Sequence, residues 1–190
     1  MPISHPVEYL RTALTLAREL CCPLVALCSQ EATAEQAVAL ANGDTDVVAI
    51  NFDGIPGGLL PKFATTDLLD ATPFAYARDT SAKRNAGLLL AGLMGWQRIV
   101  FLDDDITVPK PADLERAAYL LNRYTAVGLA ISAFPDNSVV CHAHRATGGD
   151  QGTFIGGGAL VVGTESASFF PQIYNEDWFF LIEGDRLCPA

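Results

Sequence analysis

The stretch Thr80–Ile106, TSAKRNAGLLLAGLMGWQRIVFLDDDI, decides the fold of this chain. Its first part predicts a helix that Thr80 or Ser81 caps and Gly95 ends. Apolar residues recur there at helical spacing: Ala86, Leu89, Leu90, Leu93 and Met94. The segment Arg98–Leu102, RIVFL, then predicts a strand covered on both faces in a parallel sheet. A helix that leads into a buried strand is half of a βαβ unit and predicts an α/β fold.

Three aspartates follow this strand directly. If the strand persists, Asp103 and Asp105 share one face of the sheet and Asp104 lies on the other. Two carboxylates together with the phosphate oxygens of a substrate bind Mg²⁺ or Mn²⁺. Open α/β sheets bind their ligands at this edge. We therefore expect Asp103 and Asp105 to bind a metal, and the alternative is an acidic, exposed loop.

Two further strands are predicted upstream, in Leu24–Glu31 (LVALCSQE) and Val47–Gly54 (VVAINFDG). In a parallel sheet Asp53 would lie beside Ser29 at the carboxyl edge, where a base or ribose could be hydrogen-bonded. The alternative is that Asp53 starts a turn with Gly54.

Lys83 and Arg84 lie near the start of the predicted helix, where the helix dipole disfavours cations and favours anionic ligands. A diphosphate at that position would explain the two cations. A solvated pair on the helix surface is the alternative. We interpret the neighbouring Asn85 as structural.

In order and spacing these motifs resemble the nucleotide-sugar-dependent glycosyltransferases of the GT-A fold, most closely the large inverting family 2. The matching segments are LVALCSQE, VVAINFDG, RNAG at Arg84–Gly87 and FLDDD at Phe101–Asp105. The resemblance implies a Rossmann-like, mostly parallel sheet flanked by helices. It also implies metal-dependent transfer of a sugar from a nucleoside-diphosphate sugar to a hydroxyl acceptor. The donor sugar, the base, the acceptor and the choice between inversion and retention stay open.

The resemblance also assigns roles to individual residues. Asp53 would contact the base, Lys83 and Arg84 the diphosphate, and Asp103 with Asp105 the ribose and the metal. The complete set expected around the sugar nucleotide is Ser29, Glu31, Asp53, Lys83, Arg84, Asp103 and Asp104.

The C-terminal third carries a glycine-rich segment and an acidic helix start. Thr153–Gly163, TFIGGGALVVG, has strand character broken by three glycines. The resemblance places Gly157 and Gly158 beside the acceptor, and a bulged strand is the alternative. Asn175–Leu181, NEDWFFL, predicts a helix with Asn175 as N-cap and a packing face of Trp178, Phe179 and Leu181.

The same acidic helix start matches the Glu-Asp motif of the resembled family. That match makes Asp177 the candidate general base, with Glu176 as its catalytic neighbour and Trp178 as an acceptor contact. A helix start with ordinary capping chemistry is the alternative.

Composition limits the classes of partner. The chain has 190 residues, a net charge of −10 and a pI near 4.5, which argues against nucleic-acid or anionic-membrane binding through a basic surface. No apolar run reaches the roughly 18 residues of a membrane-spanning helix. Charged residues within residues 1–22 argue against a signal peptide, so a cytoplasmic location is expected.

We expect one domain over 1–190, with an N-terminal helix at 1–22, a nucleotide-binding half at 23–110 and an acceptor half at 111–190. The early end after the acidic helix suggests either a minimal or truncated domain, or an acceptor site completed by another chain, as in a homo-oligomer. A further amphipathic helix is predicted over Asp113–Arg123.

The cysteines and histidines carry no recognisable metal motif. The five cysteines are odd in number, have no zinc-type spacing and are expected to be reduced. His142 and His144 alternate on a predicted strand, but no third ligand lies near them. They are expected on the acceptor side rather than at a metal.

Two rival functions remain at this stage. A sugar-phosphate nucleotidyltransferase also uses metal-binding aspartates, but it needs a glycine-rich basic loop after its first strand, and SQEATAEQ has none. A non-catalytic module derived from a glycosyltransferase would bind nucleotide without turnover.

Overall fold

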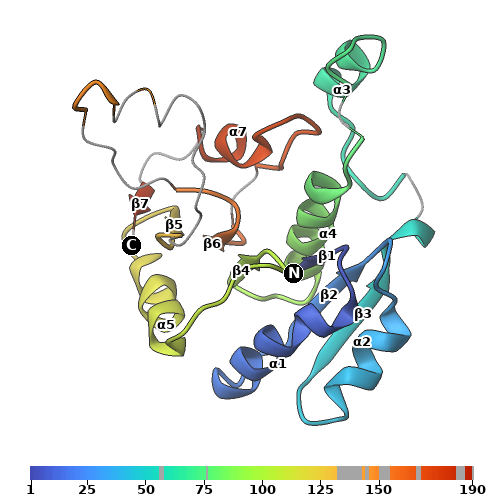
Figure 1. The fold of residues 1–190 in the computed structure, drawn as a ribbon, viewed down its shortest axis with the longest axis vertical. Helices are drawn as coiled ribbons and strands as arrows, with labels where there is room; N and C mark the ends of the chain where they lie inside the picture. Colours follow the sequence, from blue (N-terminus) through green and yellow to red (C-terminus); the bar gives the residue numbers. More distant parts are fainter. Residues whose placement is uncertain are drawn as a thin grey trace.

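The computed structural model describes residues 1–55, 58–75, 77–131, 143, 146–149, 155–165, 168–182 and 187–189. The strands are β1 (Pro2–Ile3), β2 (Leu24–Cys28), β3 (Val47–Asn51), β4 (Arg98–Leu102), β5 (Ala126–Gly128), β6 (Ala159–Gly163) and β7 (Leu187–Pro189). The α-helices are α1 (Leu10–Glu19), α2 (Ala34–Ala41), α3 (Ala64–Leu69), α4 (Thr80–Leu93), α5 (Pro111–Leu120) and α7 (Glu176–Ile182). The described residues also form two short 3₁₀ turns, η1 (Val7–Tyr9) and η2 (Phe52–Gly54) (Figure 1).

The described strands form two sheets. In the first, β1 and β3 pair in parallel with the two edges of β2, with Pro2 opposite Leu27 and Leu24 opposite Val47. The second has the order β4-β6-β5-β7. In it β6 runs antiparallel to both β4 and β5, and β7 runs parallel to β5. The edges of the two sheets that face each other are β1 and β4 (Figure 1).

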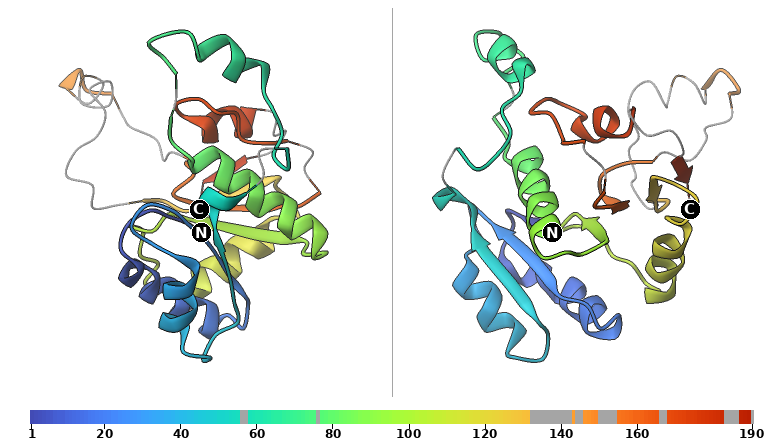
Figure 2. Two further views of the ribbon diagram at one scale, coloured as in Figure 1. Left: turned by 90° about the vertical axis from the view of Figure 1, so that its right-hand side faces the viewer. Right: turned by 180° about the vertical axis from the view of Figure 1, so that it is seen from behind.

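Helices cover both faces of the strands. Successive side chains of a strand point to opposite faces, so each strand packs against helices on both sides. On β6, Ala159 and Val161 belong to one core cluster, while Leu160 and Val162 belong to another. The first cluster includes buried residues of α1, α2 and α5, and the second includes residues of α4 and α7. Figure 2 shows these two groups of helices on opposite sides of the strands.

The first cluster also joins the two sheets. It contains Ile3 and Ala26 from the parallel sheet and Leu102 and Val161 from the second sheet. The molecule is therefore a layered, mixed α/β protein whose two sheets share a core.

The prediction of α/β architecture is confirmed, but the strand arrangement differs from the expected single, mostly parallel sheet. The strands predicted within Leu24–Glu31, within Val47–Gly54 and at Arg98–Leu102 are present as β2, β3 and β4. However, β4 pairs antiparallel with β6, and no parallel partner for β4 is present in the described residues. The N-terminal region, expected as a helix alone, opens with β1 before α1. Two residues are too few to produce a periodic strand signal.

The buried face of α4 was wrongly predicted. Leu93 and Met94, on the predicted apolar stripe, are 85% and 56% exposed. The buried face instead carries polar residues, including Lys83, Arg84 and Asn85. These side chains find hydrogen-bond partners inside the protein, which makes their burial tolerable. Gly95, with φ +68°, follows the end of the helix as expected.

The packing face of α7 also differs from the prediction. Phe180 and Leu181 are buried, whereas Trp178 and Phe179 are about half exposed. Phe180 stacks on Phe170, with ring centroids 4.0 Å apart. Asn175 precedes the helix with φ +59°, the left-handed region rather than the extended conformation of a standard N-cap.

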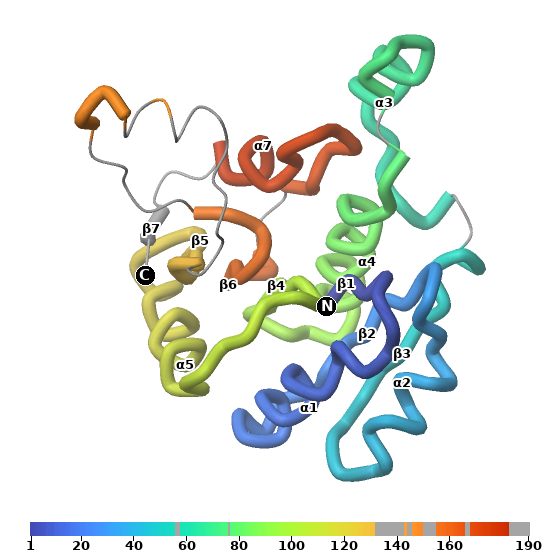
Figure 3. Tube along the Cα trace, viewed as in Figure 1, coloured from blue at the N-terminus to red at the C-terminus, as the bar shows by residue number. Residues whose placement is uncertain are grey.

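Helix α3 stands away from both sheets (Figure 3). It contains no buried residue, and Leu68 and the nearby Phe74 are 73% and 77% exposed. The helix predicted over 113–123 is α5 and starts at Pro111, which suits a first helical position. No helix in the described ranges is both long enough and apolar enough to cross a bilayer. His142, His144, Thr153 and Phe154 lie outside the described residues.

Candidate functional site

The guanidinium of Arg84 forms the centre of the candidate site. The side chain enters from α4 and is only 3% exposed. Its Nη1 donates to Oε1 of Glu176 at 2.6 Å, and its Nη2 donates to both carboxylate oxygens of Asp103, at 2.9 and 3.2 Å. Asp103 directly follows β4 and Glu176 opens α7. One planar cation therefore joins three segments that are distant in the sequence.

Burial shapes the electrostatics of this group. Desolvation raises the pKa of Asp103 above its usual value, although the positive charge of Arg84 opposes the shift. The pKa of Glu176 is raised for the same reason, again against Arg84. Two carboxylates beside one guanidinium carry a net negative charge in ionised form. Such a group favours a nearby proton or cation.

The glycine-rich segment closes over Arg84. The backbone N–H of Gly157 donates to Oδ2 of Asp177 at 2.7 Å. A Cβ built on Gly157 would lie 2.4 to 2.6 Å from guanidinium atoms of Arg84, so only glycine fits here without displacing that group. On Gly158, a Cβ would lie 2.8 Å from Cδ1 of Ile131. The predicted glycines therefore allow close approach, and they lie beside Asp103 and Asp177.

Asp103 and Asp104, the first two of the three aspartates after β4, contact different partners: Asp103 bonds to Arg84, and Asp104 bonds to the chain after β1. The strand ends at Leu102 and the chain turns, so the alternation of a strand no longer applies. Asp104 accepts from the backbone N–H groups of Ser4 and His5 at 3.1 and 3.3 Å, and its Oδ2 lies 3.0 Å from Nδ1 of His5. Asp105 is exposed.

The contact between Asp104 and His5 changes the pKa of both groups. Hydrogen bonding to Asp104 is the main cause that raises the pKa of His5. Burial acts to raise the pKa of Asp104, but the hydrogen bonds from Ser4 and His5 outweigh it, and the pKa is lowered. This contact ties the chain after β1 to the chain after β4.

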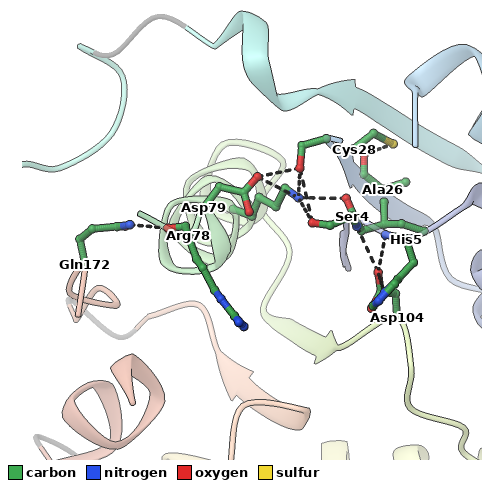
Figure 4. Close-up of polar contacts among 11 residues, drawn as sticks. Ser4, His5, Ala26, Cys28, Arg78, Asp79, Asp104 and Gln172 are labelled. Atoms are coloured by element: carbon green, nitrogen blue, oxygen red, sulfur yellow. Dashed lines mark hydrogen bonds and ion pairs between the residues drawn. The ribbon is translucent and has the colours of Figure 1, made fainter. Parts of the chain in front are cut away.

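Lys83 lies in a second buried polar network, which includes Ser4 and Asp79, both labelled in Figure 4. Its ammonium donates to the backbone carbonyl of Ile3 at 2.9 Å and to the hydroxyls of Ser4 and Ser29 at 3.0 and 2.7 Å. It also lies 3.1 Å from Oδ2 of Asp79, which accepts from Ser29 at 2.7 Å. Lys83 has no exposed side-chain surface. In this structure its ammonium therefore contacts protein groups rather than an open site.

The remaining predicted residues lie around this core at different depths. Ser29 is buried in the network of Lys83, whereas Glu31 and Asp53 are exposed beyond the ends of β2 and β3. Trp178 is 49% exposed on α7, next to Asp177. The structure thus brings together Asp103, Arg84, Glu176, Asp177 and Gly157. It leaves Glu31 and Asp53 at the surface.

A divalent cation is compatible with the oxygen donors after β4, although they do not form a closed site. Asp103 is 33% exposed and Asp105 is exposed, so hard carboxylate oxygens remain accessible there. No group of three or more His, Cys, Asp or Glu side chains arranged for a metal occurs in the described part of the chain. A cation such as Mg²⁺ would therefore need water or phosphate oxygens as further ligands.

Sequence reasoning missed Asp79 and His5, which both contact predicted site residues. The spacing of Asp79 and Lys83, four residues apart, was a usable signal because such pairs face each other on a helix. Nothing local links His5 to Asp104. The structural interpretation of Asn85 is confirmed: its amide donates to the carbonyl of Phe170 at 2.8 Å and accepts from the N–H of Phe170 at 2.7 Å.

Comparison with known proteins adds no assignment, because no family model, curated protein or solved structure matches this chain.

Proposed function

We propose that this protein transfers a sugar from a nucleoside-diphosphate sugar to a hydroxyl acceptor, with Mg²⁺ or Mn²⁺ as cofactor. The observation that carries the proposal is the convergence of Asp103, Arg84, Gly157 and Asp177 where β4 ends and β6 begins. These residues come from the motifs that resemble glycosyltransferases. They meet at a strand end, where α/β proteins bind ligands.

In this proposal Asp177 is the general base. Its carboxylate takes the proton of the acceptor hydroxyl as the acceptor oxygen bonds to the anomeric carbon and the bond from that carbon to the diphosphate breaks. The N–H of Gly157 holds Oδ2 of Asp177, and the N–H of Trp178 holds Oδ1 at 3.0 Å, so the carboxylate has a fixed orientation. A bound Mg²⁺ or Mn²⁺ would supply positive charge to the leaving diphosphate.

Arg84 and Glu176 act as positioning residues here. Arg84 bonds both Asp103 and Glu176, so it fixes the end of β4 relative to the start of α7. Asp103 and Asp105 are the proposed metal and ribose contacts. Asp53 is the proposed base contact.

The first test is calorimetric titration of UDP, GDP, CDP and ADP, each with and without Mn²⁺. We expect one nucleotide to bind in a metal-dependent way, and Asp105→Ala to weaken that binding by at least about tenfold, or ~1.4 kcal/mol. Asp44→Ala, an exposed carboxylate in the loop after α2, is the matched control and should bind normally. Binding that is equal with and without metal would contradict the metal assignment.

The second test separates catalysis from binding. Asp177→Asn keeps an oxygen that accepts from Gly157 but cannot take a proton, so nucleotide binding should persist while transfer falls by about 10²- to 10⁴-fold. Asp177→Ala removes the acceptor as well and should also lower thermal stability. Full transfer by Asp177→Asn would eliminate Asp177 as the base.

One observation favours the non-catalytic module as a second candidate. Both cations expected at the diphosphate, Lys83 and Arg84, are buried and bonded to protein groups. A module of this kind would bind nucleotide but neither hydrolyse nor transfer the donor sugar. Incubation with a sugar nucleotide and product analysis distinguishes the two. Formation of a sugar nucleotide from a nucleoside triphosphate and a sugar phosphate would instead identify a nucleotidyltransferase.

A further inference from the structure

An apolar slot of about 690 Å³ lies between β2 of the first sheet and β4 of the second. Its lining includes Leu16 of α1 and Leu20 at the end of that helix, Leu24 and Val25 of β2, and Ile99 and Val100 of β4. Gly87 of α4 borders the same space, and Lys83 and Arg84 line it too, although their charged groups bond elsewhere. The slot is therefore enclosed by helices of both layers and bounded by two strands.

The strand on the first side of the slot has backbone groups available for pairing. β1 pairs only Pro2 and Ile3 with Leu27 and Cys28, while β2 extends back to Leu24. The N–H of Leu27 donates to the carbonyl of Met1, and the nitrogen of Met1 donates to the carbonyl of Val25. In a parallel ladder the N–H and C=O of one residue point to the same side. The N–H of Val25 therefore points into the slot, at the next position of the ladder.

The strand on the second side is open in the same way. The N–H of Asp103 donates to the carbonyl of Gly158, which sets the alternation of the β4–β6 pair. Ile99 and Phe101 then direct their backbone groups toward β6, and Val100 and Leu102 direct theirs toward the slot. The slot thus has a sheet edge on each side, β2 on one and β4 on the other, and each edge directs backbone donors and acceptors into the slot.

Apolar walls, two facing strand edges and cover from both helix layers together define the space of a buried β-strand. Met1 already lies opposite Ala26, and the slot continues past Val25 and Leu24 to Pro23 and Cys22. Since a strand residue advances about 3.3 Å, this length accommodates about four residues. β1 lies in line with this space, at one end of it. A strand in it would continue β1 backward from Met1 without a change of direction.

We propose that the slot is a strand site, and that its occupant is an extended apolar peptide segment of about four residues joined to the nitrogen of Met1. The segment lengthens β1, pairs with Val25 on one side and with Val100 on the other, and merges the two sheets into one. The inference stands apart from the proposed function, since it uses none of the chemistry at Asp103 or Asp177.

The test uses the full chain carrying a four-residue segment before Met1, Val-Ile-Val-Val, with Gly-Ser-Gly-Ser and Val-Asp-Val-Val as controls of equal length. The apolar segment should raise the unfolding midpoint by at least about 4 °C over Gly-Ser-Gly-Ser, because it buries side chains and pairs backbone groups. Val-Asp-Val-Val should lose that gain, because its carboxylate would enter the apolar slot.

Amide hydrogen exchange provides the second readout. With Val-Ile-Val-Val the amides of Val25 and Val100 should exchange at least about tenfold more slowly than with Gly-Ser-Gly-Ser. Equal midpoints and equal exchange for the two segments would overturn the proposal. If the free, end-blocked Val-Ile-Val-Val peptide protected the same amides as strongly as the attached segment does, the slot would be a docking site for a separate chain. That result would overturn the covalent assignment.

Discussion

At the scale of single residues, Gly157 shows how little space the site leaves. Its Cβ would overlap the guanidinium of Arg84, which two carboxylates hold in place. Gly157→Ala must therefore displace Arg84 and loosen both ion pairs. We expect a loss of about 1–3 kcal/mol in the free energy of unfolding, measured by urea denaturation.

Gly156→Ala is the matched control for this substitution. A Cβ there meets Oδ2 of Asp177 at 3.5 Å, an ordinary contact, and should cost less. Equal losses in the two variants would mean that the overlap with Arg84 does not limit the segment.

His5 makes a pH-dependent contribution to stability through Asp104. The pKa of His5 is raised above 6.5 in the folded protein, so its contribution is fully present below pH 6.5 and is lost as the pH rises through the folded pKa. His5 is 52% exposed, and we expect less than about 1 kcal/mol. Urea midpoints at pH 5.5 and 8.5 should differ more for the wild type than for His5→Ala. A wild-type difference no larger than that of His5→Ala would refute the contribution.

Local sequence patterns predicted which residues belong to the site better than they predicted which residues bond to each other there. The acidic cluster, the Arg-Asn pair and the glycines were all identifiable, since each motif is contiguous in the sequence. The bonds of Arg84 to Asp103 and Glu176 span 19 and 92 residues, and no periodicity encodes such distances. Burial of Lys83 was missed for the same reason, because its hydroxyl and carbonyl partners come from other elements.

At the scale of elements, α2 is the helix with the best-defined start. The hydroxyl of Thr33 accepts from the N–H of Gln36, and the amide oxygen of Gln36 accepts from the N–H of Thr33, a complete capping box. Thr33→Ala should cost about 1 kcal/mol in thermal or urea unfolding, whereas Thr33→Ser should cost less because it retains the hydroxyl. Equal losses for Ala and Ser would mean that the cap bond contributes nothing.

Strand composition was a dependable guide to the elements, whereas strand direction was not. β2, β3 and β4 appear where runs of bulky apolar residues predicted them. A buried antiparallel strand such as β4, covered on both faces, has the same composition as a parallel one. The pairing of β4 with β6 depends on residues about 60 positions further along the chain, in a ladder that no local signal specifies.

At the scale of the whole molecule, the shared core predicts that both sheets unfold together. Ile3 is fully buried in the first sheet, while Trp96 and Trp178 lie near β4 and in α7. Ile3→Ala should cost about 2–5 kcal/mol and lower the midpoints from tryptophan fluorescence and far-UV circular dichroism equally. Val38→Ala, on an exposed position of α2, is the control. A fluorescence midpoint unchanged by Ile3→Ala would mean that the second sheet unfolds independently.

The chain passes from one sheet to the other only once in the described residues, and it does so by way of α3. Every strand of the first sheet precedes that helix, every described strand of the second follows it, and α3 contributes no buried residue to either. A protease that cuts the backbone in this exposed arm would separate the polypeptide into two pieces, each with its own sheet. The apolar contacts of Ile3 and Ala26 with the other half would still hold the pieces together, so the nicked protein would keep its shape.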